Sequence, residues 1–423
     1  MAETQVTYAE AVIKERIEPE VRDMFLEVQD LYNRISNGKG KRTNARGVRI
    51  PSRVRRNASF GAIGESGTLP TAGRSEFVEL KVYPTSLFSG YRVSRLAIAN
   101  CKGDEDSLVN LLSFEMEAAL DSARAKINDA IPLDGTGEIA RVKSRDSGTQ
   151  FTCESTSAGG NMFGNIKVLA NAGLSFYDPV GQAYRATPTT SIVSGDPDPS
   201  TQTVTVDSLS AAVAQGDRVC FSGSFNRYPH GFDALINNGS GMIEGQSRAT
   251  YPGLRSVTFD AKNADPTVAL FNKVRALLKF RHKMADRTTI VSAPGVKVKY
   301  EEQGHELSRF NRNGSGGTMK LDFGNVHHGP AGNEWEDYPV IQPNIVWGVD
   351  FNEIHKYELE DFGPLKVGEQ YLWLGVGTSG GQRVDAVEGW VGARFDIGTP
   401  LPLAHWRINN SGTTDQPLAQ LAF

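Results

Sequence analysis

Hydrophobic residues recur at helical spacing along Asp104–Ile131, the longest such stretch in the chain. They follow the i, i+3, i+4, i+7 pattern that places one apolar stripe along a helix. Acidic residues at 104–106 favour the positive end of the helix dipole, and Pro132 ends the pattern. At about 1.5 Å per residue the stretch predicts a rod of about 40 Å. Its apolar positions are Leu108, Leu111, Leu112, Met116, Ala119, Leu120, Ala123, Ile127 and Ala130.

A shorter stripe of apolar residues precedes this stretch near the N-terminus, where residues 7–36 predict two helical pieces. The apolar positions of the second piece are Val21, Met24, Val28, Leu31 and Ile35. Their alternating steps of three and four are typical of a coiled coil, but about two heptads are too short to be stable alone. The piece therefore packs either on its own subunit or, as an arm, on a neighbour, and the pattern leaves both open.

Alternating hydrophobic and polar residues predict strands at Phe77–Tyr83 and Tyr91–Leu96, which we expect to form a long two-stranded excursion after the glycine-rich 61–75. Residues 166–235 contain short strands at about ten-residue spacing and predict a small β-module. A second helix is expected over 265–284, with Val268, Phe271, Val274, Leu277 and Leu278 inward. Further elements are a strand at Thr288–Val291, a helix from Pro294 to Gln303, and strands at Thr318–Phe323, Asn344–Val349, Glu369–Val376 and Asp385–Phe395.

Composition adds few constraints. The 423 residues suffice for about two or three domains, and the net charge of −4 does not indicate a nucleic-acid-binding protein. Three isolated cysteines favour a reducing compartment without a disulfide framework. We find no apolar run long enough to span a membrane and no signal-peptide core, so no membrane partner is expected.

The charge distribution is less even than the total, because residues 37–60 carry eight basic residues and no acidic one. Such a block usually stays extended and binds something acidic. Nucleic acid is one possible partner, by phosphate neutralisation, but the block has no interleaved aromatics for base stacking. An acidic patch on a neighbouring subunit is therefore preferred over specific nucleic-acid binding. The alternative is a solvated loop.

The candidate catalytic motifs in the sequence lack the structural context that each of them requires. Gly375–Gly381 matches both a dinucleotide-binding pattern and a serine nucleophile pattern around Ser379. Both patterns need a helix directly after the motif, whereas the residues that follow Gly381 are strand-like. The adjacent His327 and His328 would point to opposite faces of a strand, and no cysteine lies near a histidine at ligand spacing. The acidic cluster at 334–337 is most often a solvated loop. No catalytic residue, cofactor or metal is expected.

The order of these elements resembles the major capsid proteins of tailed double-stranded DNA phages with the Hong Kong 97-type fold. The resemblance implies an α+β fold in which Arg56–Ala97 is the extended loop and Asp104–Ile131 the spine helix, followed by the glycine turn Leu133–Gly137. It implies an axial domain containing the helix–strand–helix Ala264–Gln303 and the late strand within Gly332–Asp350. The expected division begins with an N-terminal arm at 1–55, an extended β-hairpin loop at 56–98 and a peripheral domain at 99–165. An inserted β-domain follows at 166–235. The chain ends with an axial domain at 236–408, which includes return strands of the peripheral domain, and a tail at 409–423.

By this resemblance the chain would be a structural protein of the virion. It would self-assemble in the host cytoplasm through hexamers and pentamers into an icosahedral shell around DNA. Its partners would be further copies of itself, a separate scaffolding protein or guidance by the short arm, a portal, and possibly a decoration protein, with non-specific DNA contact at most. Lys81 is the only lysine of the extended loop, so no covalent crosslinking is expected. The expected interface residues are Val21, Met24, Val28, Leu31, Ile35, Arg49, Arg53, Arg55, Arg56, Phe77, Leu80 and Lys81. The alternatives are an encapsulin-type compartment shell and a glycine-rich β-hydrolase using Ser379.

Overall fold

The computed structural model divides into two compact units, which are described separately. One unit contains Met1–Gln29, Leu87–Ala125 and Phe362–Ala393, and the other contains Asp30–Ser86, Lys126–Asp361 and Arg394–Phe423. The structure describes residues 31–36, 47–63, 65, 67–94, 111–154, 168, 170–185, 190–195, 197, 201–262, 264–281, 288–301, 334–342, 344–366, 373–376 and 383–411.

The described strand residues of the first unit belong to a four-stranded sheet, and most of one strand of that sheet, 355–361, belongs to the second unit. The order of this sheet is β17-β19-β18, and β3 also pairs with β19. Glycines let β3 approach closely, because a Cβ on Gly392 would lie 2.0 Å from the carbonyl oxygen of Leu87. The predicted strands at 344–349, 369–376 and 385–395 are confirmed in part or whole, whereas 318–323 lies outside the described residues. The bounds are β3 (Thr85–Ser94), β17 (His355–Pro364), β18 (Trp373–Val376) and β19 (Arg383–Gly398).

The predicted long helix is confirmed as α4 (Leu111–Ala130), and residues 104–110 lie outside the described part of the chain. Its small residues Ala119 and Ala123 are buried, as are Ile127 and Ala130 nearer its C-terminal end. These positions are four, four and three residues apart, so they form the single stripe that the sequence pattern predicted. The alanines allow other segments to lie close to the helix axis.

The second unit contains a five-stranded sheet of order β13-β20-β16-β14-β15. Its bounds are β13 (Val257–Asp260), β14 (Thr289–Ser292), β15 (Trp335–Asp337), β16 (Val346–Val349) and β20 (Trp406–Asn409). α6 (Val268–Arg281) and the helix over 294–301 belong to the same apolar core as the sheet. The inward residues of α6 are Leu270, Phe271, Val274 and Leu278. The predicted inward positions Val268 and Leu277 are both 44% exposed, because the apolar stripe of α6 is rotated toward Leu270.

A seven-stranded sheet of order β7-β6-β10-β4-β5-β9, with β8 beside β6, forms the β-module. Its bounds are β4 (Glu138–Arg145), β5 (Gln150–Glu154), β6 (Gly173–Asp178), β7 (Ala183–Tyr184), β8 (Ser191–Ile192), β9 (Thr203–Thr205) and β10 (Arg218–Phe221). The predicted start at 166 is therefore wrong. β4 and β5 pair with strands of the predicted module and share its core, so this sheet begins at Glu138.

Phe151 is a key residue of that core. It is fully buried, and its ring lies 5.1 Å from that of Phe176 in an edge-to-face arrangement. Phe151→Ala is expected to lower the free energy of unfolding by about 3–5 kcal/mol, because it removes buried apolar area and leaves a cavity. Chemical denaturation would measure this. Phe60→Ala is the control, since Phe60 is 96% exposed and its truncation should change the free energy of unfolding by less than about 0.5 kcal/mol.

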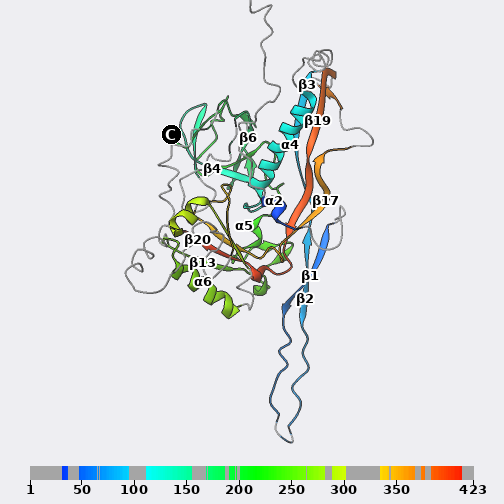
Figure 1. Ribbon diagram of the computed structural model, residues 1–423, viewed down its shortest axis with the longest axis vertical. Helices are drawn as coiled ribbons and strands as arrows, with labels where there is room; N and C mark the ends of the chain where they lie inside the picture. Colours follow the sequence, from blue (N-terminus) through cyan, green and yellow to red (C-terminus); the bar gives the residue numbers. More distant parts are fainter. Residues whose placement is uncertain are drawn as a thin grey trace, which may run out of the picture. The chain divides into compact units, whose positions relative to one another are not determined.

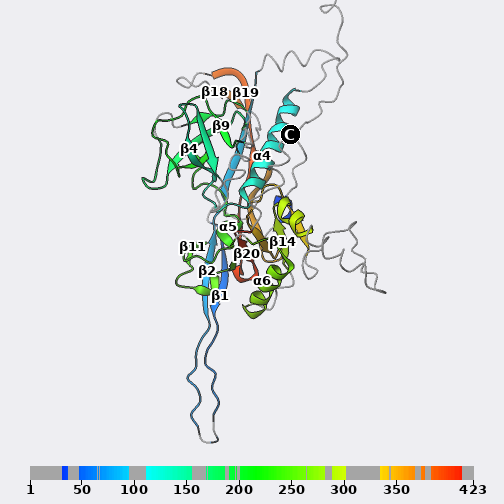
Figure 2. The same ribbon diagram turned by 90° about the vertical axis from the view of Figure 1, so that its left-hand side faces the viewer.

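The remaining element of the second unit is an antiparallel ribbon of β1 (Val48–Arg55) and β2 (Glu76–Val82). Figures 1 and 2 show that the chain continues beyond β1 as two adjacent extended segments that turn and return to β2. The predicted excursion is confirmed, but its predicted pairing is wrong. Phe77–Tyr83 pairs with β1, and β3 pairs with β19 instead. The basic block supplies one leg of the ribbon, so the hairpin begins at Val48 rather than at residue 56.

Candidate assembly surface

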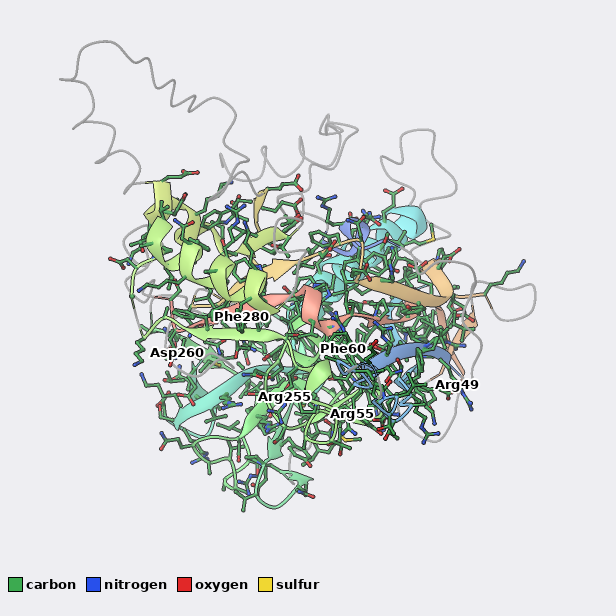
Figure 3. The ribbon with its side chains drawn as sticks, turned by 90° about the horizontal axis from the view of Figure 1, so that it is seen from below. Arg49, Arg55, Phe60, Arg255, Asp260 and Phe280 are labelled. Atoms are coloured by element: carbon green, nitrogen blue, oxygen red, sulfur yellow. The ribbon has the colours of Figure 1, made fainter. Side chains whose placement is uncertain are left out.

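One face of the β1–β2 ribbon is charged and exposed. Arg49, Arg53 and Arg55 alternate along β1 and share this face, as period-two strand geometry requires. Arg49 lies opposite Lys81 on β2, and Arg53 lies opposite Phe77, which is 65% exposed. The ribbon therefore presents to solvent a row of guanidinium groups with an aromatic side chain among them. Arg49 and Arg55 can be followed in Figure 3.

Two of these cations already have acidic partners on the same ribbon. Arg49 Nη1 lies 3.3 Å from Glu79 Oε2, and Arg55 Nη1 lies 3.1 Å from Glu76 Oε2. Exposed pairs of this kind contribute only about 0–1 kcal/mol, so they leave the arginines available for exchange with another partner. Arg53 and Arg56 are exposed and have no acidic partner among the described residues.

The opposite face of the ribbon is apolar and buried. It consists of Ile50, Val78, Leu80 and Val82, with Ser52 donating a hydrogen bond to the carbonyl oxygen of Pro400 at 3.2 Å. Leu80 is 0% exposed, so its predicted role at an interface between subunits is wrong. Its side chain instead helps to fix the base of the ribbon to the chain's own core.

Beyond the strands the excursion exposes apolar side chains. Phe60 is 96% exposed and Leu69 is 82% exposed. The two legs remain adjacent, because Asn57 Nδ2 donates to the carbonyl oxygen of Gly73 at 3.0 Å. A two-stranded hairpin is marginal in water on its own, and exposed apolar residues on it indicate a surface that another molecule covers.

The predicted arm is partly attached to its own chain. Leu31 and Ile35 are buried, so their predicted role at an interface is wrong, and Val21, Met24 and Val28 lie outside the described residues. α2 (Leu31–Arg34) is fixed by the backbone N–H of Tyr32, which donates to Asn128 Oδ1 at 2.9 Å. For this end of the N-terminal stripe, packing on the same subunit is the correct alternative.

The acidic cluster at 334–337 is not a solvated loop. Trp335–Asp337 is strand β15, and Arg34 lies 2.9 Å from Glu334 and 2.8 Å from Glu336. Asp337 accepts a hydrogen bond from Lys297 Nζ at 2.7 Å. These carboxylates join α2 and the helix over 294–301 to the edge of the five-stranded sheet. Sequence reasoning missed this role, because each partner is far away in the chain.

The candidate motif Gly375–Gly381 begins at the end of β18. β18 and β19 are antiparallel neighbours, so a strand follows the motif, as predicted. Ser379, His327 and His328 lie outside the described residues. Within the described ranges no group of three or more His, Cys, Asp or Glu side chains could hold a metal ion, and no helix is long and apolar enough to cross a membrane.

No protein-family model matches the chain, and no curated protein matches it. Several solved structures match the chain. The capsid asymmetric unit of cyanophage A-1(L) is 14% identical, with 95% of this chain and 98% of that chain covered and a TM-score of 0.57. The capsid of a native GTA particle is 9% identical, with 96% and 98% covered and a TM-score of 0.50. The similarity covers nearly the whole of each chain and establishes a shared fold.

Proposed function

We propose that this chain, which has the Hong Kong 97-type α+β fold of those capsid structures, is the major capsid protein of a tailed double-stranded DNA phage. Copies would assemble through hexamers and pentamers into the icosahedral head of the virion. The function lies in contacts between subunits, and no active site is part of the proposal.

The observation that carries this proposal is the uncovered excursion. More than half of the side chain is exposed at Phe60 and Leu69, on the hairpin that continues beyond β1 and β2 (Figure 1), and at Phe77 on β2 itself. A second copy of the chain would cover these residues and supply carboxylates for Arg49, Arg53 and Arg55. Each such contact is modest, but a subunit that touches several neighbours gains through multivalency.

Further partners follow from the same proposal. A separate scaffolding protein would guide curvature, a portal would occupy one vertex, and a decoration protein could bind outside. The packaged DNA would make non-specific contacts at most. Lys81, the extended loop's only lysine, is partly buried on β2, and we propose that the shell is not covalently crosslinked.

Electron microscopy and light scattering of the purified chain test the proposal. Closed shells or five- and six-membered rings are expected, either from the chain alone or after co-expression with the scaffolding protein encoded beside it. A matched variant in which an Asn-Gly turn replaces residues 57–73 should remain monomeric and folded. A monodisperse monomer under both expression conditions would contradict the proposal.

A further inference from the structure

A small hairpin holds the base of the ribbon in the second unit. β11 (Met242–Ile243) pairs with β12 (Gln246–Ser247), and the two-residue turn between them is Glu244-Gly245. Both turn residues have positive φ, 45° at Glu244 and 83° at Gly245. Positive φ at both central residues is the geometry of a tight hairpin turn, which is less favourable for glutamate than for glycine. Glu244 is therefore held there by its contacts.

Those contacts join the turn to β2, beside which β11 lies in Figure 2. The backbone N–H of Lys81 donates to the carbonyl oxygen of Glu244 at 2.8 Å. The side-chain amide of Gln246 donates to the carbonyl oxygen of Glu79 at 2.9 Å. β2 is the returning leg of the extended hairpin, so this turn fixes the point from which the hairpin leaves the core.

The Glu244 carboxyl group is enclosed at this point. Its Oε1 accepts a hydrogen bond from the backbone N–H of Thr399 at 3.0 Å, while Oε2 is buried without a hydrogen-bond partner among the described residues. A Cβ added to Gly398 would lie 2.7 Å from Glu244 Oε1 and 2.7 Å from a methyl group of Val82. The carboxyl group thus occupies a tight space between β2 and the end of β19, with one oxygen unsatisfied.

Charged and titratable groups face it from each neighbouring element. Asp396 on β19 is fully buried, and His230 Nδ1 lies 2.8 Å from its Oδ2. Arg248, after β12, donates to the carbonyl oxygens of Ala234, Leu235 and Met242. Tyr357 on β17 lies beside Gly398. His230 and Arg248, the cations whose charges act on Glu244, already contact other acceptors, and the Asp396 carboxylate disfavours ionisation of Glu244.

We propose that Glu244 is a pH-sensitive latch on the base of the extended hairpin. The neutral carboxyl group holds the β11–β12 turn against β2. Ionisation of that group expels it toward solvent, breaks the bond between Lys81 N–H and the Glu244 carbonyl oxygen, and frees the hairpin to change its direction. No covalent bond changes in this step, and the only transfer is of one proton from the carboxyl group to water. In an assembled shell, the new direction of the hairpin would change the contact between neighbouring subunits. This last consequence rests on the proposed function.

The pKa of Glu244 supports the direction of the switch. Burial is the largest cause, and together with the nearby Asp396 carboxylate it raises the pKa to about 8 against the opposing effects of the Thr399 N–H, His230 and Arg248. Because the folded-state pKa lies above the ordinary value, the latched state binds a proton that the released state gives up. The latch is therefore closed at low pH and opens as the pH rises through about 8.

Hydrogen–deuterium exchange on the unassembled chain tests this without requiring shells. Exchange of peptides spanning 76–82 and 242–248 would be followed between about pH 6 and 9.5 and divided by the intrinsic exchange rate at each pH. In the wild-type chain, protection of both peptides should fall about tenfold across this range. Glu244→Gln, which is permanently neutral, should keep its protection. Glu79→Gln, an exposed carboxylate on the same ribbon, should behave as the wild type.

Two results would overturn the proposal. A wild-type chain whose protection does not change with pH excludes the latch, whatever the variants do. An equal loss in Glu244→Gln would assign the transition to another group, such as the His230–Asp396 pair. If Glu244→Gln does not fold, the wild-type profile decides alone, with the peptide spanning β14 as the internal reference that should stay protected. Failure of shell assembly would leave these outcomes unaffected.

Discussion

Replacing Arg53, Arg55 and Arg56 by glutamate is expected to abolish shell assembly while leaving the subunit folded. All three side chains are exposed, and Arg53 and Arg55 lie on the exposed face of β1. Reversal would set like charges opposite any carboxylates that a neighbouring subunit presents, and like charges placed together at an interface are unfavourable. The cost is repeated at each neighbour, so we expect the assembled fraction to fall by more than about tenfold.

Sedimentation and electron microscopy would measure assembly, and circular dichroism would confirm the fold. The matched control reverses Lys143, Arg145 and Arg227, three exposed cations of the β-module, and changes the net charge equally. If both triple variants lose assembly to the same extent, overall charge is the cause. Normal shells from the Arg53, Arg55 and Arg56 variant would show that these residues make no essential contact.

Gly348→Ala is expected to prevent stable folding of the second unit. Gly348 lies on β16, which has β14 on one side and β20 on the other. A Cβ there would lie 1.8 Å from Cε2 of Trp406, well inside van der Waals contact. Trp406 cannot move easily, because it is buried and its indole N–H donates to Thr288 Oγ1 at 3.1 Å. The added methyl group should cost about 3 kcal/mol or more.

Chemical denaturation and the yield of folded protein would report this loss. Gly363→Ala on β17 is the control, because a Cβ there has no atom within 4 Å. The control should unfold within about 0.5 kcal/mol of the wild type. Equal stability of the two variants would mean that Trp406 has room to shift, and that the packing around Gly348 is looser than the structure shows.

The contrast between these two variants shows where sequence reasoning ends. The exposed arginines could be identified from the sequence, because a run of cations without acids is visible in the letters. The requirement for glycine at 348 could not, because it arises from the ring of Trp406, which is far away in the chain and adjacent only in the sheet. The same holds for Arg34 and its carboxylate partners at Glu334 and Glu336.

The sequence by itself determined the elements whose signal is local: the rod α4 with its stripe of small residues, the helix α6, the strands β14 and β19, and the existence of an extended excursion. Tertiary structure decided which strand pairs with which, where the β-module begins, and whether an apolar residue such as Leu31, Ile35 or Leu80 faces the chain's own core or a neighbour. The physical reason is that periodicity records which side of an element is apolar. The surface that covers that side is supplied by residues distant in the chain, so only the folded arrangement can identify it.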